Sequence, residues 1–366
     1  MRIGNLRLEN FRNYPEQEFF FSPHITILSG GNAQGKTNVL EALYLLAVGR
    51  SHRMSGEKDL VREGTGGFRL QLDLERNQVK HRVQASYSVE QGKGLRVDQK
   101  AYRNRLGGVV TGLQVVLFAP EDLELVKGAP ALRRRFLDEQ VFIGSGSYRK
   151  TLNRFNRALS QRNRVLKDYI GQNMPPELIS SWDKQLVESG CELIRERARA
   201  VRELAPVACA MHQELSGGTE DLLLDYRPSV EADAQGYFQR LQEKRVAERA
   251  RGISLVGPHR DDLSLQIDGL ELRSHGSQGQ QRCAVLALKV AVREEIRKRE
   301  GVMPVLLLDD VLSELDVARQ RRLLAVLGKE NQTIITCTDK EMIVRSPSMQ
   351  RAHLYEVERG LARRVQ

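Results

Sequence analysis

Eight consecutive residues near the N-terminus have the spacing of a phosphate-binding loop. They match the pattern G-x-x-x-x-G-K-[S/T] and are Gly30, Gly31, Asn32, Ala33, Gln34, Gly35, Lys36 and Thr37. Glycines let successive backbone N–H groups turn toward one phosphate, and a following helix adds the positive end of its dipole. We therefore expect Lys36 to reach the β- and γ-phosphates of a nucleotide and the Thr37 hydroxyl to bind Mg²⁺.

A phosphate loop of this kind needs a carboxylate for its metal ion at the end of another buried strand. Four apolar residues, 305–308, are followed directly by Asp309 and Asp310. Asp309 is expected to hold Mg²⁺ directly or through water, and Asp310 to orient or deprotonate an attacking water. An acidic pair after a strand is by itself more often a turn. Combined with the loop, it makes Lys36, Asp309 and Asp310 the predicted catalytic residues.

The elements that must position these residues can be read from hydrophobic periodicity. An apolar strand at 24–28 precedes the loop and a helix beginning near residue 38 follows it. The first hundred residues alternate as strands do, the period is helical over 121–215, and short strands, a long helix and two apolar strands follow residue 253. This order predicts an α/β body interrupted by a mostly helical insert.

Composition excludes several classes of protein. The chain has 366 residues, 40% of them hydrophobic, and a formal net charge of +10, so fibrous, collagen-like and globally disordered proteins do not fit. The longest clean apolar run, 42–48, is far shorter than the roughly 20 residues that a bilayer requires, and the N-terminus alternates like a strand rather than a signal peptide. The scattered cysteines predict neither a disulfide framework nor a zinc site, and favour a cytoplasmic protein; they are Cys191, Cys209, Cys283 and Cys337.

Positive charge is concentrated in the helical insert. Between residues 133 and 167 there are ten Lys and Arg residues against two acids. Helical spacing places four of these cations on the face opposite Leu152, Phe155, Leu159 and Leu166, namely Lys150, Arg154, Arg157 and Arg164. The alternative is an ordinary solvated face, but such faces usually mix charges. A phosphate backbone is the polyanion that this face fits, and the low aromatic content favours duplex or junction DNA over bare single strands.

Two further motifs flank the acidic strand. Ser277, Gly279 and Gln280 open a helix with one apolar stripe, and Ser313 and Asp316 follow the acidic pair. The first motif resembles the signature loop of ABC-type ATPases and the second resembles their D-loop. In that superfamily the signature helix of one chain caps the γ-phosphate that the partner chain binds. The resemblance therefore implies a homodimer with ATP held between two copies.

Several blocks narrow this resemblance to one family. They run in family order along essentially the whole chain, at 6–14, 49–53, 117–123, 126–128, 133–138 and 257–262, and they are similar to those of the RecF family. The resemblance implies an ABC-type ATPase head with mixed sheets around a P-loop core, related to structural-maintenance and Rad50 ATPases. The N-terminal half of the ATPase lobe is expected at 1–118 and a helical lobe at 119–251. The C-terminal half of the ATPase lobe, with the signature, the acidic strand and the D-loop, is expected at 252–366.

The family resemblance also implies a function in bacterial recombinational repair. RecF proteins bind ATP, dimerise on it, engage DNA at gap junctions, and work with RecR and RecO so that RecA displaces single-strand-binding protein. Their slow, DNA-stimulated ATP hydrolysis resets the complex. We weigh three alternatives against this: the ATPase subunit of a transporter, a chromosome-tethering ATPase, and a DNA-binding adaptor with structural ATP. Only 240 residues separate Thr37 from Ser277, which leaves no room for a long coiled-coil arm.

Two positions differ from the general ABC patterns, and the motifs do not assign chemistry to three other polar residues. Asp310 stands where transporters and chromosome ATPases usually carry Glu, and no histidine follows the strand 333–338, where Thr338 is a candidate substitute. Arg12 either reaches the nucleotide or pairs with an acid. His259 and Arg260 are expected to organise the junction between lobes and to do no chemistry.

Overall fold

The N-terminal strands bury about every second side chain, because apolar and polar residues alternate along them. In β1 (Arg2–Phe11), Leu6, Leu8 and Phe11 are fully buried. A shift in pairing register just after Ile3 brings that residue onto the same buried face. The six strands form an antiparallel sheet in the order β2 (Tyr14–Phe20), β1, β4 (Gly67–Arg76), β5 (Val79–Ser88), β6 (Gly92–Val97) and β7 (Lys100–Arg103).

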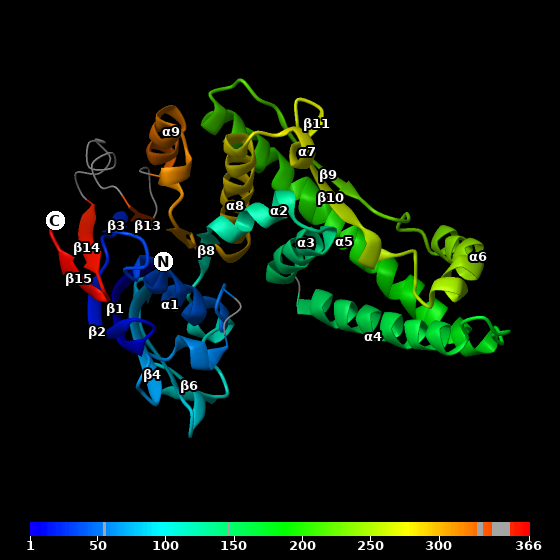
Figure 1. Cartoon of the computed structure of the whole chain (residues 1–366), viewed down its shortest axis with the longest axis horizontal. Helices are drawn as coiled ribbons and strands as arrows, with labels where there is room; N and C mark the ends of the chain where they lie inside the picture. The colour runs from blue at the N-terminus through cyan, green and yellow to red at the C-terminus, as the bar shows by residue number, and fades with distance from the viewer. Residues whose placement is uncertain (54–55, 145, 328–331, 339–351) are drawn as a thin grey trace. The chain divides into compact units, whose positions relative to one another are not determined.

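A second six-stranded sheet is parallel except at one edge, where β14 and β15 are antiparallel. Its order is β15 (Leu361–Arg364), β14 (His353–Glu358), β3 (Ile25–Ser29), β13 (Thr333–Cys337), β12 (Val305–Leu308) and β8 (Val115–Phe118). The three central strands are buried along their whole length, as strands covered on both faces must be. Helix α1 (Lys36–Val48) shares one apolar core with both sheets (Figure 1).

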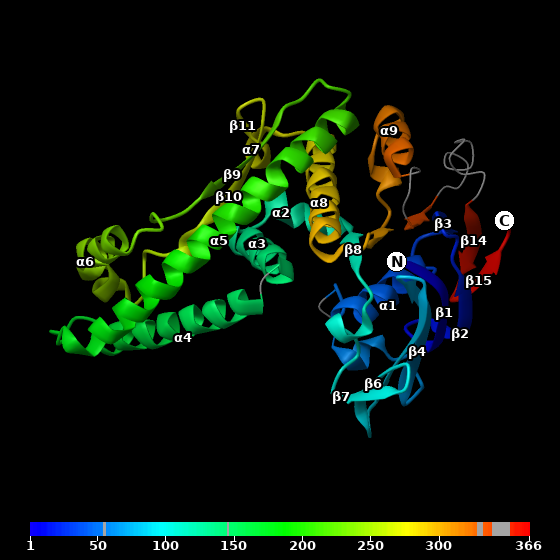
Figure 2. The same cartoon turned by 180° about the vertical axis from the view of Figure 1, so that it is seen from behind.

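The segment between residues 123 and 292 is mostly helical. Its longest helix, α5 (Glu177–Ser216), runs beside α4 (Gly146–Asp168) in both views (Figures 1 and 2). The strands β9 (Leu222–Arg227), β10 (Asp262–Ile267) and β11 (Leu270–Glu271) form a three-stranded antiparallel sheet, and β9 packs against α5. The other helices are α2 (Glu124–Lys127), α3 (Pro130–Gly144), α6 (Ala234–Arg251), α7 (Leu272–His275) and the start of α8 (Gln278–Glu300).

The structure describes residues 1–53, 56–144, 146–327, 332–338 and 352–366. The chain divides into two compact units: Met1–Asp122 with Arg293–Gln366, and Leu123–Val292. The mixed α/β class is confirmed. The first boundary lies four residues from the expected 118/119, but the second lies inside α8 rather than at 251/252. The reason is that β10 pairs with β9 along its whole length, which joins 252–292, signature included, to the helical unit.

The remaining described elements are short. They are α9 (Val317–Leu327) and the 3₁₀ turns Glu57–Leu60, Val109–Thr111, Pro120–Leu123, Pro258–Arg260 and Leu312–Glu314. In the ranges that the structure describes, no helix combines the length and the apolar character needed to span a bilayer. All four cysteines are free thiols.

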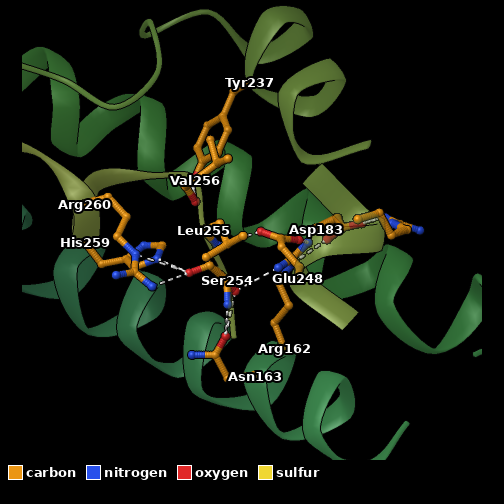
Figure 3. Close-up of polar contacts among 11 residues, drawn as sticks. Arg162, Asn163, Asp183, Tyr237, Glu248, Ser254, Leu255, Val256, His259 and Arg260 are labelled. Carbon is orange, nitrogen blue, oxygen red and sulfur yellow. Dashed lines mark hydrogen bonds and ion pairs between the residues drawn. The ribbon is translucent and has the colours of Figure 1, made fainter. Parts of the chain in front are cut away.

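A buried set of charges fixes α4 within the helical unit (Figure 3). Arg162, in the middle of α4, is fully buried and donates to Asp183 of α5 at 2.7 Å, to Glu248 of α6 at 2.6 Å and to Ser254 at 2.8 Å. Arg245 also donates to Asp183. Two guanidinium groups thus balance two carboxylates that are themselves fully buried. The basic helix owes its place to this network as well as to its apolar face.

Removing Arg162 is expected to destabilise the helical unit strongly. Arg162→Ala leaves Asp183 and Glu248 buried with one cation fewer, and breaking a buried pair in this way costs about 3–5 kcal/mol. Trp182, adjacent to Asp183, is the chain's one tryptophan and reports on this unit in a urea titration followed by fluorescence.

Arg164→Ala is the matched control, since Arg164 is an exposed cation two residues away on the same helix. We expect it to change the free energy of unfolding by less than about 0.5 kcal/mol. Equal losses for the two variants would show that the buried charges do not fix α4.

Candidate functional site

The loop between β3 and α1 has the backbone shape of a phosphate cradle. Gly30 and Gly35 adopt φ angles of 155° and 117°. A Cβ atom at Gly30 would lie 2.3 Å from the carbonyl oxygen of Val357, and one at Gly35 would lie 2.6 Å from Nδ2 of Asn13. Both glycines are therefore favoured by their backbone conformation, and Gly30 is also required by space because its neighbour is backbone. Because α1 begins directly after this loop, the free N–H groups of its first turn and its dipole favour an anion.

The Lys36 side chain lies over the loop that precedes it. Its Nζ donates to the carbonyl oxygens of Gly30 at 2.6 Å and Gly31 at 2.7 Å. Burial lowers the pKa of Lys36, and the charges of Asp310 and Asp309 oppose that shift. The loop thus holds its positive charge through neutral carbonyls, without a bonded counter-ion among the described residues.

The predicted metal ligands are in contact with each other. Oδ1 of Asp309, at the end of β12, accepts hydrogen bonds from the hydroxyls of Thr37 at 2.9 Å and Thr336 at 2.7 Å. The three residues meet because the carboxyl ends of parallel strands share one edge of the sheet. Burial raises the pKa of Asp309, while the two hydroxyl bonds act against the rise.

Asp310 is held in an unusual conformation beside that carboxylate. Its φ of 51° is left-handed, which is rare for a residue with a side chain. Its N–H donates to Thr336 Oγ1 at 2.8 Å and its carbonyl accepts from Ser313 Oγ at 2.8 Å. The Asp310 Oδ1 atom is buried and has no hydrogen-bond partner among the described residues. Strain and an unsatisfied oxygen at one residue are typical of a functional position.

These oxygens fit Mg²⁺. The ion prefers hard ligands and usually binds through one or two carboxylates with phosphate oxygens and waters. Thr37 and Asp309 supply a hydroxyl and a carboxylate already in contact, and Asp310 adds a buried oxygen that has no hydrogen-bond partner among the described residues. These are the side chains that would hold the ion. In the described ranges, no group of three or more His, Cys, Asp and Glu side chains has metal-site geometry.

A cavity of about 950 Å³ opens over the loop. Its size is that of a small-molecule site. Of the predicted nucleotide-binding residues, Asn32, Ala33, Gln34, Gly35, Lys36 and Thr37 line it, together with Asp309 and Asp310. Gly30 and Gly31 lie outside this lining and contribute carbonyls to Lys36.

The turn between β1 and β2 brings Arg12 to the same cavity. Its guanidinium donates to both oxygens of Glu41, at 2.8 and 2.7 Å, and to the carbonyl of Asp59 at 2.7 Å. Burial alone would raise the pKa of Glu41, but bonds from Arg12 and Ser51 hold it below its ordinary value. Of the two roles left open for Arg12, pairing with an acid is the one that its contacts show.

Sequence reasoning missed two other residues at this site. Asn13 donates to the carbonyl of Gln34 at 2.8 Å and accepts from Asn38 at 2.8 Å, so the β1–β2 turn holds the loop. Arg53 lines the cavity and donates to the Asn38 side chain at 3.2 Å. Both residues lie in blocks that resemble the RecF family, 6–14 and 49–53, and that resemblance was the available signal, although it assigned neither residue a role.

The D-loop residues are exposed near Asp310. Ser313 donates to the Asp310 carbonyl, and Asp316 accepts from the N–H of Arg319 at 2.9 Å, which caps α9. Thr338 is exposed after β13, and the threonine that contacts the carboxylate is Thr336.

The signature residues belong to the second unit and form a reciprocal cap. Gln280 N donates to Ser277 Oγ at 3.2 Å, and Ser277 N donates to Gln280 Oε1 at 2.9 Å. This capping box orders the start of α8, whose N-terminal N–H groups, including that of Gly279, face outward from the helix end.

The basic face of α4 is exposed as expected. Lys150, Arg154, Arg157 and Arg164 are all exposed, while Phe155 and Leu166 are buried. None of the four cations forms an ion pair with a residue in the ranges described, so their charges are uncompensated locally. Arg162, counted among the cations of the insert, is the exception, because it is buried in the network of Figure 3.

His259 and Arg260 act inside the helical unit (Figure 3). The Nε2 of His259 lies 3.0 Å from the Ser254 carbonyl, and Arg260 donates to the same oxygen at 3.0 Å. Burial lowers the pKa of His259 to about 4. These contacts hold the turn that contains Ser254, and Ser254 accepts a hydrogen bond from Arg162. The contacts of His259 and Arg260 are therefore structural.

Residues 2–361 match the family model for the RecF/RecN/SMC N-terminal domain. The chain is 42% identical over 350 residues to the DNA replication and repair protein RecF of Synechococcus sp. (strain JA-3-3Ab), covering 92% of this chain and 91% of that protein. The RecF of Staphylococcus aureus (strain JH9) is 38% identical over 371 residues, with 98% and 99% covered. The chain belongs to the RecF family. The family resemblance read from the motifs is thereby confirmed.

Solved structures agree with this assignment. The recombination mediator protein RecF-ATP of the RecFOR pathway is similar over 100% of this chain and 97% of its own, with a TM-score of 0.83 and 29% identity. The Smc head domain of Pyrococcus furiosus is similar with a TM-score of 0.60 at 16% identity, over 99% of this chain and 95% of its own. The second likeness concerns the fold alone, and it confirms the expected ATPase-head architecture.

Neutralising the buried carboxylate is expected to stabilise the protein while removing its metal ligand. Because burial raises the pKa of Asp309, its ionised form is disfavoured in the folded chain. Asp309→Asn keeps an oxygen for the two threonine hydroxyls, so we expect roughly 0.5–2 kcal/mol of added stability without nucleotide. Thermal unfolding with and without Mg²⁺ and ATP measures both effects: the ligands should raise Tm in the parent protein only.

Glu63→Gln serves as the control, since Glu63 is an exposed carboxylate that also lines the cavity. It should leave Tm and its response to ligand nearly unchanged. A less stable Asp309→Asn variant, or one that Mg²⁺ and ATP still stabilise fully, would contradict the role given to this carboxylate.

Proposed function

We propose that the chain is an ATP-dependent DNA-binding protein of recombinational gap repair and replication restart. ATP joins two copies, the joined form binds duplex or single-strand/double-strand junction DNA, and slow DNA-stimulated hydrolysis separates the copies again. One observation supports this above the others: the chain carries two different anion-binding elements on two separate units, the loop at 30–37 and the capped helix start at 277–280.

On this proposal the site residues of the first unit have distinct roles. Lys36 and the N–H groups of the loop bind the β- and γ-phosphates, while Thr37 and Asp309 hold Mg²⁺. Bound Mg²⁺ neutralises phosphate charge and polarises the phosphoryl oxygens. Asp310 accepts a hydrogen bond from the attacking water, and so orients it, through Oδ1, which has no partner in the part of the chain that the structure describes. The side chain of Asp310 is shorter than that of Glu, which fits slow ATP hydrolysis better than rapid turnover.

The signature completes the nucleotide site from a second copy. Ser277 Oγ accepts from Gln280 N, which leaves the hydroxyl hydrogen available to a γ-phosphate. The N–H of Gly279 and the positive end of the α8 dipole act in the same direction. Ser313 and Asp316 are exposed on the first unit, so they are accessible to the partner copy on this proposal.

DNA binding is assigned to the exposed face of α4. Because Lys150, Arg154, Arg157 and Arg164 have no ion-pair partner within the described ranges, backbone phosphates are the partners that suit them. The family suggests RecR and RecO as protein partners and the loading of RecA as the outcome of their joint action. We expect the protein to act in the cytoplasm. Of the alternatives, a transporter or tethering subunit is disfavoured because the similar curated proteins reported above are RecF proteins and the likeness to the Smc head concerns the fold alone. An adaptor with structural ATP is an outcome of the first test.

ATP-dependent dimerisation is the first test. In sedimentation velocity with Mg²⁺ and ATP, the parent protein should be a dimer. Lys36→Ala should stay monomeric because it loses the phosphate ligand, and Ser277→Arg should stay monomeric although it still binds ATP. Because a two-fold dimer has two composite sites, mixing the two variants should restore about half of the parent ATPase rate per heterodimer.

This mixture is decisive, since its one intact site combines the loop of one variant with the signature of the other. No recovery on mixing, or a parent protein that remains monomeric at saturating ATP, contradicts the bridging of two copies. A DNA-responsive dimer that never releases phosphate would instead favour the adaptor alternative.

The salt dependence of DNA binding tests the basic face. The triple variant Arg154→Ala, Arg157→Ala, Arg164→Ala should bind a gapped duplex more weakly. The slope of log K against log salt should fall by about 0.9 for each phosphate contact that is lost. Fluorescence anisotropy at several salt concentrations measures both quantities.

Asn153→Ala with Asn156→Ala is the matched control, because these exposed neutral residues lie on the same helix. It should leave the slope unchanged. If the triple variant keeps the parent slope, the DNA-binding surface lies elsewhere.

A further inference from the structure

The Gln280 side chain has contacts in two directions. Its Oε1 accepts the N–H of Ser277, as part of the cap on α8. Its Nε2 donates to Oε1 of Glu220 at 3.4 Å. Glu220 lies in the connection between α5 and β9, sixty residues earlier in the chain. No motif in the sequence indicated this glutamate.

Glu220 favours the same orientation of the Gln280 amide as the Ser277 N–H does. A carboxylate accepts hydrogen bonds and donates none, so only the NH₂ end of the amide can face it. The carbonyl end of the amide must then face the Ser277 N–H, which is the orientation that the cap requires. With the amide reversed, an NH₂ group would meet that N–H, donor against donor, and the cap would be lost.

The carboxylate of Glu220 is itself held from the other side. Its Oε2 lies 3.0 Å from Nε2 of His212, a fully buried residue in the last turns of α5. Because the carboxylate can only accept, the Nε2 atom carries the hydrogen of this bond. Only 13% of the Glu220 side chain is exposed. A part-buried polar chain therefore runs from the buried His212 of α5 through Glu220 to the start of α8.

We propose that Glu220 is the positioning residue of the signature loop. Through Gln280 it holds the cap in which Ser277 Oγ serves as acceptor, so that the hydroxyl hydrogen and the N–H groups at the start of α8 stay directed at a phosphate. The inference rests on the proposed function, since the phosphate is the γ-phosphate bound by a second copy. A negative charge close to an anion site opposes binding, so its contribution lies in orientation and not in charge.

The test compares ATP-dependent dimerisation with ATP binding by single copies. A hydrogen bond to a charged group is worth about tenfold in an equilibrium, so with two signature loops per dimer, Glu220→Ala should weaken dimerisation about a hundredfold. Binding of a fluorescent ATP analogue to dilute, monomeric protein should stay unchanged, because the phosphate loop belongs to the other unit. Glu220→Gln retains an acceptor oxygen and should dimerise within about threefold of the parent protein.

Glu214→Ala is the control, because it removes an exposed carboxylate from the last turns of the same helix, α5. It should match the parent protein in dimerisation and in Tm. A double variant, Glu220→Ala with Gln280→Ala, should be no weaker than the worse single variant, since both act through one bond. A purely structural role predicts additive losses instead.

The outcomes separate the two proposals. If the parent protein dimerises with ATP and Glu220→Ala dimerises equally well, or if the double variant is additive, the positioning role is overturned while the proposed function stands. If Glu220→Gln fails as completely as Glu220→Ala, orientation of the amide is not what Glu220 supplies. A parent protein that stays monomeric with ATP overturns the proposed function, and this inference with it.

Discussion

One oxygen atom, Oδ1 of Asp309, joins the parts of the nucleotide site. It accepts from Thr37 in the first turn of α1 and from Thr336 in β13, so one acceptor at the end of β12 aligns a helix start and two strand ends. Two neutral hydroxyls do not balance a buried negative charge, and its raised pKa reflects this. The fold thus maintains a carboxylate that a divalent cation would satisfy. The strained Asp310 beside it depends on the same strand ends.

The sequence was sufficient for the parts of the site that local chain geometry determines. A strand, a glycine loop and a helix start are consecutive in the chain, so the pattern at 30–37 fixes their arrangement. The acidic pair could be added because carboxyl ends of parallel strands meet at one edge. Exposure of Arg154, Arg157 and Arg164 followed from helical periodicity alone, since opposite faces of one helix need no knowledge of distant residues.

Contacts between distant segments could not be predicted in this way. Arg12 and Glu41, or Gln280 and Glu220, are polar residues whose partners are set by the tertiary fold. The boundary inside α8 depends on the pairing of β9 with β10, which no local pattern encodes. Arg162 did leave a signal: it stands three residues after Leu159 and four before Leu166, on the apolar face of α4. A cation at such a position indicates a buried partner.

The Arg162 network and the Asp309 site treat buried charge differently, and this difference bears on the proposed switch. In the helical unit two guanidinium groups and two carboxylates balance each other, which favours one rigid arrangement. At the end of β12, no cation among the described residues is bonded to Asp309, which accepts hydrogen bonds from the hydroxyls of Thr37 and Thr336. On the proposed mechanism, a bound cation would compensate this charge, whereas the Arg162 network is already balanced within its own unit.

If each unit carries a half-site, as proposed, nucleotide binding depends on the concentration of the protein. If ATP strengthens the association of two copies, linkage requires that association strengthen ATP binding by the same factor. DNA that binds two copies side by side raises their local concentration and so favours the closed site without touching the nucleotide. On this view, DNA can stimulate hydrolysis without a conformational change transmitted from α4 to Asp310. It is sufficient that DNA brings the signature loop of each copy to the phosphate loop of the other.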